Sequence, residues 1–185
     1  MFQELGVLPG SEVFDVNPGA ISREMGLNVV RAGSFDCDRR YCVSRENYGS
    51  YLLLYTREGT GIVDTCGSSY TVRPGDFALI DCYHKHSYRT DSKWKFDWIH
   101  VKGNIVEQFY TTVAAMKQDH VFFVGRDYRV VHTLDCLFAQ LKSPAHWATT
   151  SGPASSPLQM VRLSWICGTS AFPTACCPHR WDRGK

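Results

Sequence analysis

The chain has 185 residues, 44% of them hydrophobic and 21% charged, a composition typical of one soluble globular domain. The net charge is +2 with no block of Lys or Arg, so nucleic-acid binding by this chain alone is not expected. No apolar run is long enough to span a membrane, and the first residues do not resemble a signal peptide. The eight cysteines are therefore interpreted as reduced thiols of a cytoplasmic protein.

The N-terminal arm, residues 1–24, contains Pro9, Gly10, Pro18 and Gly19 among residues of mixed character. Such a composition predicts an extended segment with loose local structure.

From residue 27 onward the sequence predicts a series of short strands. The turn signals between them include Glu58-Gly59, Cys66-Gly67 and Pro74-Gly75-Asp76. Many short strands with regular turns predict a mainly β fold, a sandwich or a small barrel. The strand-like segments are 27–35, 41–45, 51–59, 60–65, 70–75, 77–80, 86–89 and 94–102.

The apolar period becomes helical after residue 103. The helical spacing of Ile105, Phe109, Val113 and Met116 predicts one helix. Residues 120–125 are predicted to form a short strand, and residues 127–142 a second helix with Asp127 as a possible N-cap. Both helices are expected to pack on the barrel. The second helix has a stripe wide enough to bind a partner protein instead, formed by Val130, Val131, Leu134, Leu137, Phe138 and Leu141.

Residues 143–185 begin with a linker rich in small residues and proline and continue without a clear apolar period. The segment is either a native but irregular tail or the product of a shifted reading frame.

Two histidines, His84 and His86, follow the turn at 74–76 and a short apolar run. On an extended backbone they would face the same way. His84 is interpreted as an exposed loop residue. His86 could be a buried residue hydrogen-bonded across the barrel mouth or a contact for a ligand.

The strand at 94–102 has one aromatic face. Strict alternation places Trp94, Phe96, Trp98 and His100 together, which indicates the barrel interior. The opposite face carries Lys95, Asp97, Ile99 and Val101.

The segment 27–142 resembles the cupin-type effector-binding domain of the AraC/XylS family of transcriptional regulators. The resemblance rests on the order and spacing of YLLLY at 51–55 with Gly59 and Gly61, RPGD at 73–76, HSY at 86–88 and WKFDWIH at 94–100. It implies a cupin or jelly-roll-like barrel, residues 25–142, with an N-terminal arm and C-terminal helices packed on it.

The resemblance also implies a site for a small effector, such as a sugar. In sugar-responsive members, a tryptophan at the position of Trp98 stacks on the sugar, a tyrosine at that of Tyr88 lies beside it, and an arginine near that of Arg45 binds hydroxyls. Phe96 stands where such members can carry a histidine. With His86 and His100, these residues form the candidate ligand site, although the aromatic residues could instead simply fill the barrel.

A free-standing cupin enzyme, a sugar isomerase or a dioxygenase, is the alternative. Metal-dependent cupins use H-x-H and Glu on an early strand and a later His. Here His86 or His84 matches the later histidine, but the early-strand ligands are missing. The window that corresponds to H-x-H reads Arg45-Glu46-Asn47, and Leu52 or Leu53 stands about where the glutamate would be. Two candidate ligands can be counted, with His100 as a geometrically uncertain third, and a tightly held metal usually takes three or more. No pair of carboxylates is predicted in the interior either, so we expect no metal, no other cofactor and no enzymatic activity.

The predicted function is therefore the sensor and dimerisation module of an AraC-type regulator. The resemblance implies homodimer formation through the helix at 127–142. It also implies that DNA is bound only through a further domain with two helix-turn-helix units, which we do not expect in this sequence.

Overall fold

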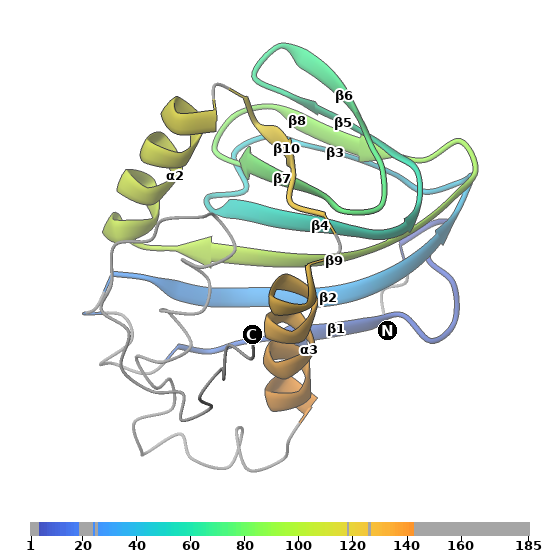
Figure 1. Cartoon of the computed structure of the whole chain (residues 1–185), viewed down its shortest axis with the longest axis horizontal. Coiled ribbons are helices and arrows are strands. Elements are labelled where there is room, and N and C mark those ends of the chain that lie inside the picture. Colours follow the sequence, from blue (N-terminus) through green and yellow to red (C-terminus); the bar gives the residue numbers. More distant parts are fainter. Residues whose placement is uncertain (1–3, 19–23, 25, 118, 126, 143–185) are drawn as a thin grey trace, which may run out of the picture.

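A computed structural model describes residues 4–18, 24, 26–117, 119–125 and 127–142. Two antiparallel sheets face each other, a six-stranded sheet in the order β1-β2-β9-β4-β7-β10 and a four-stranded sheet in the order β3-β8-β5-β6 (Figure 1). The strands are β1 (Glu12–Asp15), β2 (Asn28–Asp38), β3 (Cys42–Arg45), β4 (Tyr51–Gly59), β5 (Gly61–Thr65), β6 (Ser68–Val72), β7 (Asp76–Asp81), β8 (His86–Arg89), β9 (Lys93–Lys102) and β10 (Val121–Phe123).

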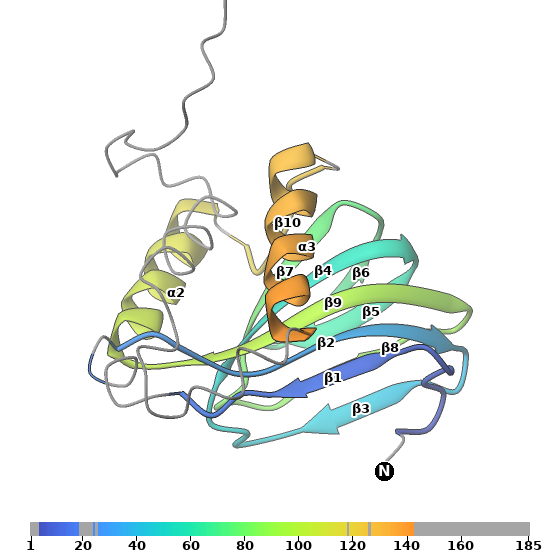
Figure 2. The same ribbon diagram turned by 90° about the horizontal axis from the view of Figure 1, so that it is seen from below.

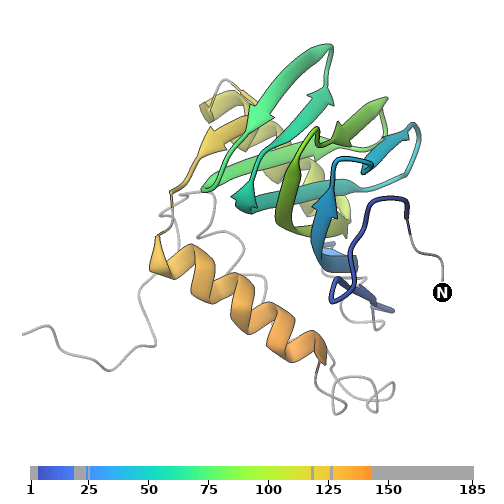
Figure 3. The ribbon, with the colours of Figure 1, turned by 90° about the vertical axis from the view of Figure 1, so that its right-hand side faces the viewer.

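Two helices, α2 (Asn104–Lys117) and α3 (Tyr128–Lys142), lie on the face of the large sheet that is turned away from the small sheet (Figures 2 and 3). The mainly β barrel of cupin type with C-terminal helices is thereby confirmed.

None of the described helices is both long and apolar enough to cross a membrane.

The large sheet separates two hydrophobic clusters. On β4, Leu52 and Leu54 belong to the cluster between the sheets, whereas Tyr51, Leu53 and Tyr55 belong to the cluster under the helices. Because successive side chains alternate between faces, a strand buried on both faces must be apolar throughout, which explains the sequence YLLLY.

Part of the N-terminal arm is a regular strand. Residues Glu12–Asp15 form β1, which pairs antiparallel with residues 31–34 of β2 and so extends the large sheet at its edge. The backbone groups of β1 that face β2 are paired in the ladder, so this part of the arm is more regular than the composition of residues 1–24 suggested.

The helix predictions need one correction. Ile105 and Met116, predicted to lie on the apolar face of the first helix, are 50% and 62% exposed, whereas Val106 and Val113 are buried. The contact face of α2 is rotated by about one residue from the prediction, because the flanking positions of a helical stripe depend on how closely the sheet approaches.

The apolar stripe of α3 is covered within the same chain. Val130, Leu134, Phe138 and Leu141 are all buried against the large sheet. Of the two origins considered for this stripe, packing on the barrel accounts for its central residues. At the start of α3, Asp127 Oδ1 accepts the backbone N–H of Arg129 at 2.8 Å, so Asp127 caps the helix as predicted.

The outer face of β9 is also covered. Asp97, expected to face away from the barrel interior, does so but is only 3% exposed, and its carboxylate binds Arg57 of β4. Arg57 in turn binds Asp135 of α3, so one guanidinium joins two strands and a helix.

Candidate ligand-binding site

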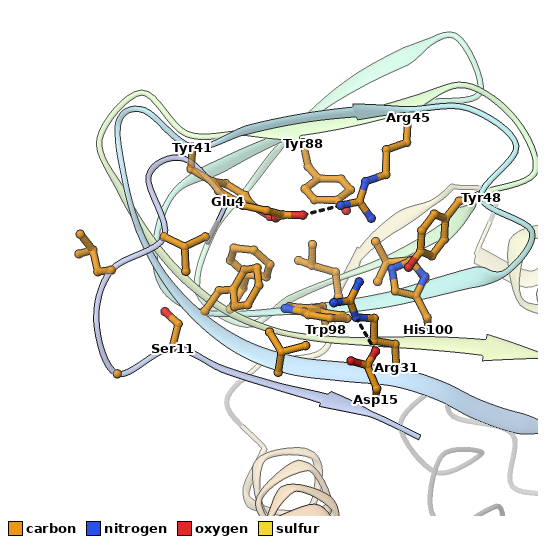
Figure 4. A pocket seen from close by; sticks show the side chains of 18 of the residues that line it. Glu4, Ser11, Asp15, Arg31, Tyr41, Arg45, Tyr48, Tyr88, Trp98 and His100 are labelled. Atoms are coloured by element: carbon orange, nitrogen blue, oxygen red, sulfur yellow. Dashed lines mark hydrogen bonds and ion pairs between the residues drawn. The ribbon is translucent and has the colours of Figure 1, made fainter. Parts of the chain in front are cut away.

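A cavity of about 610 Å³ lies between the two sheets, and residues of the N-terminal arm form part of its lining (Figure 4). This size is in the range of ordinary small-molecule sites. The lining residues are Glu4, Val7, Leu8, Pro9, Gly10, Ser11, Val13 and Asp15 from the arm, Arg31, Phe35 and Tyr41 from β2 and the turn after it, and Arg45, Tyr48, Leu52, Leu54, Tyr88, Phe96, Trp98 and His100 from later elements.

Trp98 is the largest side chain at the cavity. A Cβ atom added to Gly33, its cross-strand neighbour on β2, would lie 2.5 Å from the indole ring. The glycine therefore leaves the space in which the ring lies. Trp98 is only 8% exposed, and its Nε1–H has no hydrogen-bond partner among the described residues. A buried donor without a partner is costly, so a ligand that supplies an acceptor here would gain affinity.

The other aromatic residues form a connected wall. Phe35 packs edge-to-face on Trp98 at 5.2 Å and on Phe96 at 5.9 Å, and Tyr41 contacts Phe96 at 5.8 Å and Tyr88 at 6.2 Å between ring centroids. Burial raises the pKa of both tyrosines well above its usual value, so each hydroxyl keeps its proton at neutral pH and can donate a hydrogen bond.

Arg45, at the end of β3, reaches the cavity from the small sheet. Its guanidinium binds the carboxylate of Glu4 in the arm and lies 5.0 Å from the centroid of the Tyr48 ring. The side chains of Arg45 and Glu4 are 27% and 32% exposed, so the pair is shielded but reachable from solvent.

Arg31 reaches the cavity from the opposite sheet. Its Nε lies 2.9 Å from Asp15 Oδ1, but the geometry is that of an ion contact, because Nε has no hydrogen-bond partner among the described residues. Asp15 is 79% exposed, so this pair is weakly held.

His100 lines the site from β9 and is buried. Its Nδ1 is 2.9 Å from the buried Ser50 hydroxyl, and its ring lies 4.6 Å from Tyr48. Burial, reinforced by the nearby charge of Arg45, lowers the pKa of His100 to about 3. The imidazole is therefore neutral at physiological pH, and the positive charge of the cavity comes from the two arginines.

Five of the six predicted site residues line this cavity: Arg45, Tyr88, Phe96, Trp98 and His100. His86 does not. It is 1% exposed, its Nδ1 donates to the carbonyl oxygen of His84 at 2.8 Å, and its ring stacks on Tyr88. Of the two roles considered for His86, a ligand contact in this cavity is not seen, and the hydrogen bond is local rather than across the barrel mouth, with Nε2 lacking a partner among the described residues.

His84 lies in a turn before β8 begins, so the alternation rule does not apply to it. Its side chain is 76% exposed and contacts Asp81. In the described part of the chain, no three His, Cys, Asp or Glu side chains are grouped as a metal site requires. Metal content stays a prediction.

Several lining residues were not predicted from the sequence, above all Glu4, Arg31, Phe35 and Tyr41. The alternation along β2 was a usable signal for Arg31. It places Arg31 on the same face as Phe35, and a polar residue in phase with a buried aromatic residue indicates a site in the interior. Glu4 offered no such signal, because it reaches Arg45 from 41 residues away.

Solved structures similar to this chain include a cupin 2 conserved barrel domain protein from Leptotrichia buccalis (19% identity, TM-score 0.41, covering 55% of this chain and 43% of that one) and a cupin superfamily protein from Desulfitobacterium hafniense (14%, 0.39, covering 56% and 82%). The chain thus spans less than half the length of the Leptotrichia buccalis protein.

No curated protein matches this chain. The family described as "AraC-like ligand binding domain" matches residues 28–162, and the chain belongs to this family.

Proposed function

We propose that this chain is the sensor domain of an AraC-type transcriptional regulator and that it binds a sugar or a similar small polar molecule in the barrel. One observation carries the proposal: a cavity in a ligand-binding family domain has Trp98 on one wall and polar groups from both sheets around it. The indole face can pack on the C–H groups of a sugar, and Arg45, Tyr88 and His100 can make hydrogen bonds to its hydroxyls.

The N-terminal arm is part of the proposed sensor. Glu4 binds Arg45, and residues 7–11 line the cavity. A ligand that contacts Arg45 therefore also affects the arm, which provides a route from binding to a change at the surface.

In this proposal the protein is not an enzyme and needs no metal. It acts in the cytoplasm as a homodimer formed through α3, whose outward face includes Tyr128, His132 and Ala139. Contact with DNA would require a further domain.

Titration calorimetry with a panel of neutral and acidic sugars tests the function, with metal analysis on the same purified sample. Trp98→Ala should weaken binding of the effector by about 1–3 kcal/mol, the usual range for one well-packed aromatic residue. Tyr88→Phe should cost less, because only a hydroxyl is lost.

Phe123→Ala is the matched control, because Phe123 is 73% exposed and does not line the cavity. If Trp98→Ala keeps full affinity in a folded protein, the ligand binds elsewhere. A stoichiometric metal that is lost with His86→Ala would instead favour the cupin enzyme.

A further inference from the structure

The cavity contains two arginines, and each is neutralised by a carboxylate from the same short segment of the chain. Arg45 binds Glu4, and Arg31 binds Asp15. Figure 4 shows both pairs at the cavity, with the two carboxylates coming from the arm and the two guanidiniums from opposite walls.

The groups that the barrel itself offers to a ligand are mainly donors. Besides the two guanidiniums, these are the indole N–H of Trp98, which has no partner among the described residues, and the protonated hydroxyl of Tyr88. Guanidinium groups match carboxylates in shape as well as in charge, since two parallel N–H bonds can form at once. A neutral sugar would use only part of these donors, and both arginines would stay paired with the carboxylates of the arm.

We propose that the ligand of this site is an acidic sugar, whose carboxylate competes with Glu4 and Asp15 for Arg45 and Arg31. The inference rests on the proposed sugar-binding function and adds the chemical class of the sugar. The aromatic wall of Trp98 and Phe35 receives the apolar face of the ring, and Arg31 becomes a specificity-determining residue beside Arg45.

The test uses matched pairs of acids and neutral sugars, D-galacturonate with D-galactose and D-glucuronate with D-glucose, titrated into the full chain by calorimetry. At least one acid should bind about tenfold or more tightly than its neutral partner, the scale of one charged hydrogen bond. Its affinity should fall as the salt concentration rises.

Substitutions of opposite charge should act in opposite directions. Arg31→Gln and Arg45→Gln should each weaken binding of the acid by about tenfold, whereas Glu4→Gln should strengthen it, because the competing carboxylate is gone. Arg73→Gln is the charge-matched control, since Arg73 is exposed and does not line the cavity.

Each other outcome is decisive. If a neutral sugar binds as tightly as its acid, the acidic class is wrong while the proposed sensor function stands. Binding of the acid that Arg31→Gln leaves unchanged would overturn the two-arginine assignment. If no sugar of either kind binds, both this inference and sugar sensing are overturned.

Discussion

His100 is buried and neutral, and this has a consequence for pH stability. Its pKa is about 3 in the folded protein against an ordinary value of 6.5, mainly because of burial. Between these two values the unfolded chain binds a proton that the folded chain does not, so stability is full above pH 6.5 and is lost as the pH falls toward 3.

We therefore expect the free energy of unfolding to decrease as the pH falls below 6.5. The contribution of His100 to this decrease should approach about 1.4 kcal/mol per pH unit. His100→Gln keeps a polar group near Ser50 but does not titrate, so its stability should depend less steeply on pH in this window. Urea titrations of both proteins from pH 7 to pH 4 measure the difference, and parallel profiles would contradict the burial argument.

At the scale of the strands, β2 and β9 shape the site together. Gly33 of β2 pairs with Trp98 of β9, and a Cβ atom at position 33 would lie 2.5 Å from the ring and 2.6 Å from the Glu12 carbonyl oxygen of β1. Gly33→Ala should therefore displace the indole and weaken ligand binding, and the approach to the β1 backbone should also lower the melting temperature. Tryptophan fluorescence and calorimetry on the same variant check this, and unchanged affinity would show that the ring has another way to fit.

Arg57 links the barrel to α3 by ion pairs that differ in burial. This guanidinium binds the buried Asp97 of β9 and the exposed Asp135 of α3. Arg57→Met should destabilise the protein by about 3–5 kcal/mol, because it leaves Asp97 buried without its partner. Asp135→Asn should cost at most about 1 kcal/mol, because that carboxylate is 60% exposed. Equal losses in denaturant unfolding would mean that burial does not separate the two pairs.

For the whole molecule, α3 packs on the barrel with one face, and the proposed dimer would use the other. Leu134 is 2% exposed and packs under the helix, so Leu134→Ala should cost about 2–5 kcal/mol of stability. Ala139 lies on the exposed face, and Ala139→Glu should leave the fold intact but weaken a dimer formed through α3. Sedimentation across a concentration series separates the effects, and a parent protein that is monomeric throughout would rule out the dimer.

Residues 143–185, interpreted as a linker and an irregular or frame-shifted tail, lie outside the described residues. The family match extends into this segment as far as residue 162. The predicted boundaries of the arm, the domain and the tail are not tested by these findings.

Local patterns of the sequence determined most of the fold. Alternation, turn residues and the change to helical spacing depend on neighbours within a few positions. They predicted every described strand except β1, both helices, the Asp127 cap and the aromatic face of β9. The same alternation brought Phe96, Trp98 and His100 to one face, where they line the cavity.

Only the tertiary structure decided what each exposed or ambiguous side chain meets. Glu4 binds Arg45, which is 41 residues away in the sequence, and Ser50 contacts His100, which is 50 residues away. The central residues of the α3 stripe pack on the large sheet of the same chain. Such contacts depend on how the sheets and helices come together, which no local period encodes, because residues distant in sequence meet only when the whole domain forms.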